Sequence, residues 1–143
     1  PQSRVCLFKG FMDFLSYLTL KQTDDSAICI NAPCDYLVMN SVSNLKRTLT
    51  YLQKYTYIHC YLDNDLAGQK TVETIAGMYG RCVYNESNCY AGYKDLNDYL
   101  RGKKQWTTRS LSPPSSRRAF FISRLFLFSY PKSYLNMILK YDF

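Results

Sequence analysis

The sequence lacks several features that mark common classes of protein. Its six cysteines show no Cys-x-x-Cys spacing and it has one histidine, His59, so zinc sites and disulfide frameworks are both disfavoured. Several of the cysteines fall in apolar runs, which favours buried free thiols. No apolar run is long enough to span a bilayer and no secretory signal is present, so we expect a cytoplasmic protein with no membrane partner.

Acidic residues are nearly absent from the last part of the chain. The net charge is +7, but residues 1–101 hold ten basic and ten acidic residues, whereas residues 102–143 hold eight basic residues and one acid. That tail is rich in Ser and Phe and has no clean helical or strand period. We expect one folded domain over 1–101. The tail, 102–143, is then either a disordered or partner-binding appendage or the translation of a shifted reading frame.

Residues 1–101 alternate short apolar runs with helical patterns. Strands are predicted at 5–8, 36–39, 57–62 and 81–84, and helices at about 10–20, 45–52, 66–79 and 94–100. The apolar run 27–30 fits either a short strand or a buried loop. The first helix is apolar around most of its surface, so we expect it to be buried on most sides, with Asp13 and Ser16 as its polar positions. The alternation predicts an α/β fold, with a parallel sheet of about four strands flanked by helices.

The clearest chemical signal lies at the end of the third predicted strand. Asp63 closes that strand, and Asp65 stands where the N-cap of the next helix belongs. Two carboxylates two residues apart in extended backbone point the same way, and they repel each other unless a cation neutralises them. Oxygen ligands favour a hard ion such as Mg²⁺, with Mn²⁺ as a substitute. The alternative is that Asp65 is only a cap and Asp63 an exposed acid. Gly68 would let a ligand approach the backbone closely.

In a parallel sheet, ligands bind beyond the carboxyl ends of the strands. That rule predicts that Lys9 and Gly10, Asn40 and Ser41, the Asp63 to Asp65 stretch and the loop before Asp95 lie around one site.

Three motifs in this order resemble those of the Toprim domain. They are FKGFMD at 8–13, DNDLAG at 63–68 and KDLNDYL at 94–100, and the resemblance covers about residues 5–100. It is strongest to Toprim-like modules of bacterial primases and of primase-like proteins on mobile elements. The resemblance implies a Rossmann-like fold and magnesium-dependent nucleotidyl or phosphoryl transfer on nucleic acid, in DNA replication or mobile-element transfer. It also implies that Asp63 and Asp65 hold the metal, that Asp95 contributes to a further metal position, and that Asp13 matches a family Asp.

Two positions depart from the family pattern. Asn97 replaces an expected acid near Asp95. Lys9 stands where the family has a Glu that acts as metal ligand or general acid/base, and a charged ammonium cannot coordinate a metal. At about 4 Å and an effective dielectric near 20, each unit-charge interaction is worth roughly 4 kcal/mol, so this reversal works strongly against a metal. Lys9 could instead reach Asp63 or Asp65 and neutralise them.

The sequence therefore supports two functions. In the first, the chain is a primase-like enzyme domain, with the catalytic candidates Lys9, Asp13, Asp63 and Asp65. In the second, it is a catalytically inactive Toprim-like module that binds nucleic acid or protein. A phosphoacceptor receiver domain would need paired acids after the first strand, where Lys9 and Gly10 stand, and a dehalogenase-type phosphatase would carry Asp-x-Asp on its first strand.

Four basic residues are candidates for contact with nucleic acid, namely Lys46, Arg47, Lys70 and Lys94. Since residues 1–101 are formally neutral and phosphate binding scales with paired basic charges, we expect this part to bind DNA or RNA weakly. Most of the affinity is then expected to come from the remainder of a larger parent protein.

Overall fold

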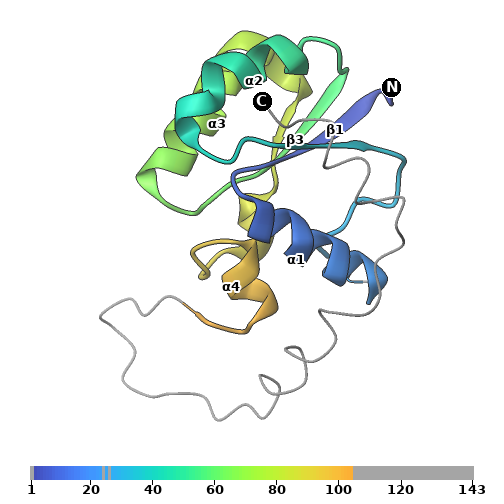
Figure 1. Ribbon diagram of the computed structural model, residues 1–143, viewed down its shortest axis with the longest axis vertical. Helices are drawn as coiled ribbons and strands as arrows, with labels where there is room; N and C mark the ends of the chain where they lie inside the picture. The colour runs from blue at the N-terminus through green and yellow to red at the C-terminus, as the bar shows by residue number, and fades with distance from the viewer. Residues whose placement is uncertain (1, 24, 26, 105–143) are drawn as a thin grey trace. The chain divides into compact units, whose positions relative to one another are not determined.

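The computed structural model describes residues 2–23, 25 and 27–104, and these form an α/β fold (Figure 1). Four parallel strands lie in the order β2-β1-β3-β4; they are β1 (Arg4–Phe8), β2 (Asp35–Val38), β3 (Tyr57–Tyr61) and β4 (Val83–Asn85). The helices are α1 (Phe11–Gln22), α2 (Leu45–Leu52), α3 (Leu66–Tyr79) and α4 (Leu96–Leu100). Three 3-10 turns complete the set, η1 (Val42–Asn44), η2 (Gly80–Cys82) and η3 (Glu86–Tyr90). The predicted fold class is confirmed, whereas nearly all of the tail, from residue 105, lies outside the described residues.

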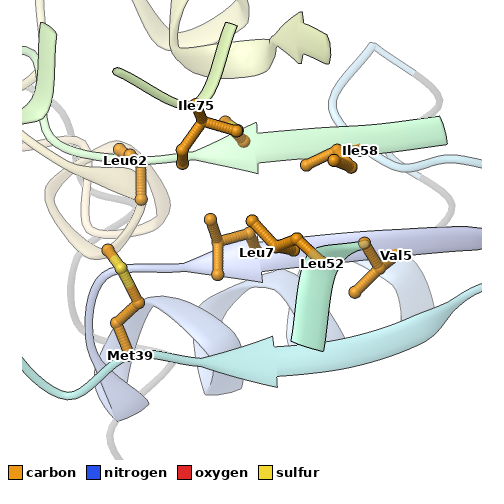
Figure 2. Close-up of a cluster of buried hydrophobic side chains, with 8 residues drawn as sticks. Val5, Leu7, Met39, Leu52, Ile58, Leu62 and Ile75 are labelled. Atoms are coloured by element: carbon orange, nitrogen blue, oxygen red, sulfur yellow. The ribbon is translucent and has the colours of Figure 1, made fainter. Parts of the chain in front are cut away.

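The face of the sheet toward α2 and α3 is covered by an aliphatic core (Figure 2). Its members are Val5, Leu7, Met39, Leu52, Ile58, Cys60, Leu62 and Ile75, all at most 3% exposed. Successive strand residues point to opposite faces, so the alternate residues of β1 and β3 enter this core together. The hydroxyl of Tyr79 in α3 also donates to the carbonyl of Leu49 in α2, 2.6 Å away, which ties the two helices to each other.

The opposite face, toward α1, carries an aromatic core. Phe8 stacks on Tyr61 with ring centroids 5.3 Å apart, and Tyr17 of α1 meets Tyr61 edge-on at 5.0 Å. Two hydroxyls then hold the segment after α1. That of Tyr17 accepts from the amide of Ile30 at 3.1 Å, and that of Tyr61 donates to the carbonyl of Ile28 at 2.8 Å. Of the two readings left open for 27–30, the structure therefore shows the buried loop.

The first turn of α1 contradicts the expectation of burial on most sides. Phe11 and Met12 are 40% and 53% exposed, whereas Asp13 and Ser16 are buried. The reason is α4, which packs against α1 through polar contacts. The hydroxyl of Ser16 donates to the carbonyl of Met12 at 2.8 Å and to Oδ1 of Asn97 at 3.4 Å.

The starts of two predicted elements shift by two residues. The strand expected at 81–84 begins at Val83, because α3 ends at Tyr79 and a 3-10 turn follows it, beginning at the C-cap Gly80, whose φ of 61° lies in the left-handed region. The helix expected from residue 94 begins at Leu96, because Asp95 is its N-cap and accepts from the amide of Asp98.

The cysteines only partly match the expectation of buried thiols. No disulfide joins any of the described residues, which include all six cysteines. Cys6, Cys29 and Cys60 are buried, Cys34 and Cys82 are half-buried, and Cys89 is exposed. No helix in the described part of the chain is long and apolar enough to cross a membrane.

Gly68 is required by the packing of α3 against the end of β3. A Cβ at this position would lie 3.0 Å from the carbonyl carbon of Asp63 and closer still to its oxygen. The close approach that the sequence suggested for a ligand is thus made by the chain itself. The absence of a side chain lets α3 begin directly beside Asp63.

We predict that Gly68→Ala destabilises the protein and Gly77→Ala does not. Gly68→Ala must displace backbone, at a cost of about 1–3 kcal/mol. Gly77 lies in the same helix, and beyond the neighbouring backbone of that helix no atom lies within 4 Å of its added Cβ, so Gly77→Ala should gain about 0.5–1 kcal/mol from helix propensity. Urea unfolding of both variants measures this difference. Equal effects of the two changes would contradict the close approach of Gly68 to Asp63.

Candidate functional site

Lys9 and Asp63 meet at the carboxyl edge of the sheet because β1 and β3 are neighbours. The register pairs Phe8 with Tyr61, so the residues just beyond the two strands come together. The ammonium of Lys9 donates to Oδ2 of Asp63 and lies 4.0 Å from Oδ2 of Asp65. The Asp63 side chain is 5% exposed, and those of Lys9 and Asp65 are 30% and 39% exposed. A cation of the chain thus lies against both carboxylates.

The ion pair fixes the charge state of Lys9. Its hydrogen bond to Asp63 raises the pKa of Lys9, and partial burial offsets only part of this effect. Burial raises the pKa of Asp63, and the hydrogen bond and charge of Lys9 act in the opposite direction. Lys9 is therefore an ammonium at neutral pH, which prevents it from acting as a general base.

Asp65 has the capping role expected from the sequence. Its Oδ1 accepts from the amide of Gly68 at 2.7 Å and satisfies one of the free donors at the start of α3. The other carboxylate oxygen faces Lys9. Both oxygens of Asp65 thus interact with groups of the chain itself.

Asp13 and Asp95 approach the same edge from α1 and from the loop before α4. Asp13 is 8% exposed, and its Oδ1 accepts from the amide of Asn97 at 3.4 Å. Burial, followed by the negative charges of Asp95 and Asp63, raises the pKa of Asp13 to about 6. Asp95 accepts from the amide of Asp98 at 2.7 Å as the cap of α4. All four predicted acids therefore lie at one edge of the sheet.

Asn64 organises the site, and sequence reasoning missed it. Its amide donates to the carbonyl of Lys94 at 2.7 Å, and its side-chain Nδ2 donates to the carbonyls of Ser87, Tyr90 and Tyr93 at 3.0–3.2 Å. These bonds tie the loop before Asp95 to the end of β3. The only signal in the sequence is the place of Asn64 between Asp63 and Asp65, and that gives no indication of its partners.

The four basic candidates are all exposed but do not form one group. Lys46 and Arg47 lie on α2 and Lys70 lies on α3, and these two helices are side by side on one face of the sheet (Figure 1). Lys94 lies in the loop before α4, where its carbonyl accepts the bond from Asn64. Contact of these residues with nucleic acid remains a prediction.

A parallel sheet with acids gathered at its carboxyl edge defines a Rossmann-like α/β domain. The family model of Toprim-like proteins matches residues 6–100, and the chain belongs to that family. None of the curated proteins compared with it matches. Among solved structures, the primase fragment of the bacteriophage T7 primase-helicase protein is similar, with 23% identity and a TM-score of 0.47. The alignment covers 71% of this chain and 40% of that one.

Toprim domains generally bind Mg²⁺, but the side chains at this edge fit a divalent metal poorly. Lys9 is bonded to Oδ2 of Asp63, and Asp65 and Asp95 each use one oxygen as a helix cap. Within residues 2–23, 25 and 27–104, no three acidic, His or Cys side chains gather as a metal-binding group. A metal at Asp63 would have to displace an ammonium that already neutralises it.

We predict that Asp13 makes the protein less stable as the pH rises from about 4 to 6. The pKa of Asp13 in the folded protein, about 6, lies above its ordinary value of 3.8, so the folded state holds the proton more tightly. The cost of burying the carboxylate is absent below about pH 4 and fully present above about pH 6, at up to roughly 3 kcal/mol. Asp13→Asn should raise the melting temperature at neutral pH. It should also make stability depend less on pH between about pH 4 and 6.

The matched control for Asp13→Asn is Glu73→Gln, which removes one exposed acid of α3. Thermal unfolding in chelator at a series of pH values compares the two variants. If the melting temperature of Asp13→Asn changes with pH in parallel with those of the native and Glu73→Gln chains, burial and the acidic neighbours do not raise the pKa of Asp13.

Proposed function

We propose that this chain is a catalytically silent Toprim-like module in which Lys9, rather than Mg²⁺, neutralises the carboxylates, and that it binds nucleic acid weakly. The observation that carries the proposal is the ion pair between Lys9 and Asp63, together with the 4.0 Å approach of Lys9 to Asp65. A fixed positive charge at that place supplies what the family obtains from a bound metal.

Two further features support a catalytically silent module over an enzyme that performs magnesium-dependent nucleotidyl transfer. Lys9 occupies the position of the family Glu, and its raised pKa keeps it from accepting a proton. The metal positions implied by the resemblance also lose ligands, since Asn97 replaces an acid and its amide donates to Asp13. Magnesium-dependent nicking or nucleotide incorporation by the native chain would overturn this proposal.

Nucleic acid is the partner that the exposed charges favour. Lys46 and Arg47 lie on α2 and Lys70 lies on α3, two helices on the same face of the sheet, and all three residues are exposed. Their number is small and residues 1–101 carry no net charge, so the binding is weak and sensitive to salt. In this proposal, the partner or parent protein supplies the remaining affinity.

We predict that Lys9→Glu raises the affinity for Mg²⁺ at least tenfold, which corresponds to about 1.4 kcal/mol. The change removes the competing ammonium and adds an oxygen ligand beside Asp63. It should also lower the melting temperature in chelator, because three carboxylates then crowd one site. Calorimetric titration with MgCl₂ and thermal unfolding with and without chelator measure both effects.

Two variants serve as controls for Lys9→Glu. Lys9→Met removes the ammonium without adding a ligand, so its affinity for Mg²⁺ should lie between the native value and that of Lys9→Glu. Lys54→Glu makes the same charge reversal at an exposed lysine that lies over the ring of Tyr51, and it should leave the affinity unchanged. If the native chain binds Mg²⁺ as tightly as Lys9→Glu does, then Lys9 leaves the site freely. The proposal of a catalytically silent module would then be wrong.

We predict that a chain ending at Arg101 binds single-stranded DNA with a dissociation constant of about 10⁻⁴ M or weaker at physiological salt. Reversal of Lys46, Arg47 and Lys70 to Glu should abolish even this binding. Fluorescence anisotropy with a labelled oligonucleotide at several salt concentrations measures both effects. Tight, salt-sensitive binding by the shortened chain, or binding unchanged by the triple reversal, would rule out the proposed surface.

A further inference from the structure

Two cysteines lie in contact far from the acidic edge of the sheet. Cys6 is in the middle of β1, and Cys34 immediately precedes β2, the neighbouring parallel strand. Their Sγ atoms are 3.4 Å apart, and both are free thiols. Cys6 is fully buried, whereas Cys34 is half-buried. The pair thus combines a residue that is partly open to solvent with one that the fold encloses.

The surroundings of Cys34 favour its thiolate. The hydrogen bond from the thiol of Cys6 makes the largest contribution, and Lys21 of α1, the hydroxyl of Tyr36 in β2 and His59 of β3 act in the same direction. Together they outweigh burial and lower the pKa of Cys34 to about 6. Lys21 is held nearby, because its ammonium donates to the hydroxyl of Tyr36 at 3.1 Å. At neutral pH Cys34 is therefore the nucleophile of the pair.

Cys6 has the opposite character while Cys34 is reduced. Its hydrogen bond to Cys34, its burial and the negative charge of Cys34 raise the pKa of Cys6, and the hydroxyl of Tyr17, 3.9 Å from its sulfur, offsets this only in part. One of these causes disappears once Cys34 is oxidised to the sulfenic acid, because the negative charge of its thiolate is lost. Oxidation of the first sulfur thus prepares the second for reaction.

We propose that Cys34 and Cys6 are a reversible redox pair, in which the thiolate of Cys34 attacks a hydroperoxide and Cys6 then closes an intramolecular disulfide. The Cys34 thiolate attacks a peroxide oxygen and breaks the O–O bond, giving Cys34 sulfenic acid and one water from hydrogen peroxide after protonation. Cys6 loses its proton, its sulfur displaces the hydroxyl from Cys34, and a second water leaves. Two thiols are oxidised by two electrons and one peroxide is reduced to two waters.

The two sulfurs are already in contact before the second step. A disulfide bond is about 2.05 Å long, so the two sulfurs must approach each other by about 1.4 Å from their present contact. The bond would join β1 to the residue that leads into β2, two strands that are already paired through Val5 and Asp35. The pairing holds the two sulfurs near each other before oxidation.

Thiol reactivity tests the first step. Native chain is treated with substoichiometric iodoacetamide at about pH 6.5, where an ordinary thiol is almost fully protonated, and the labelled peptides are quantified by mass spectrometry. We expect Cys34 to be labelled first, with a rate that reaches its midpoint below the pKa of an ordinary thiol. Cys89 is the internal control. It is more exposed than Cys34, but its pKa is raised by the partial burial of its thiol and by the charge of Glu86. Labelling of Cys89 ahead of Cys34 would overturn the proposal.

Oxidation tests the second step. After treatment with hydrogen peroxide and proteolysis, two peptides should be joined by a disulfide between Cys6 and Cys34, with a mass two hydrogens below the sum of the separate peptides. Dithiothreitol should separate them again. In Cys6→Ser the disulfide cannot form, so Cys34 should instead be trapped as sulfenic acid by dimedone. If Cys6→Ser does not fold, Cys34→Ser at the half-buried position should fold and leave Cys6 unoxidised. Irreversible oxidation of Cys34 in the native chain, or disulfides that join other cysteines first, would contradict the pair.

Discussion

The ion pair between Lys9 and Asp63 is the interaction on which the acidic edge of this protein depends. Asp63 is almost fully buried, and a carboxylate in such a place must find a counter-charge or take up a proton. The parallel pairing of β1 with β3 supplies that counter-charge from the chain itself, since the residues after Phe8 and Tyr61 meet. In this account the ammonium of Lys9 supplies the positive charge that Mg²⁺ generally supplies in Toprim domains.

The rest of the site is arranged around this pair by contacts with backbone. Gly68 lets α3 start beside the carbonyl of Asp63, and Asp65 caps that helix. Asn64 holds the loop that brings Asp95 to the same edge. The charged form of Asp13 remains unfavourable, because burial and the negative charges of Asp95 and Asp63 raise its pKa. Acids in a Toprim-like arrangement can therefore be used for capping and charge balance as well as for metal binding.

Local patterns in the sequence were enough to predict the four strands and the cap at Asp65, because these depend on neighbours within a few residues. The approach of Lys9 to the Asp pair also followed, once the strands were placed in parallel. The features missed depend on distant partners. The bonds of Asn64 span 23 to 30 residues, and the burial of Asp13 and Ser16 in place of Phe11 and Met12 depends on Asn97. No local pattern encodes such contacts.

The central claim is that Lys9 holds the place of a metal. A crystal structure of the native chain grown in excess MnCl₂, with anomalous data collected near the manganese edge, tests it directly because Mn²⁺ commonly substitutes for Mg²⁺ at oxygen ligands. The account predicts that the ammonium of Lys9 stays bonded to Asp63, with no anomalous peak between Asp63 and Asp65. A strong peak bound by both carboxylates, with Lys9 turned out to solvent, would contradict it.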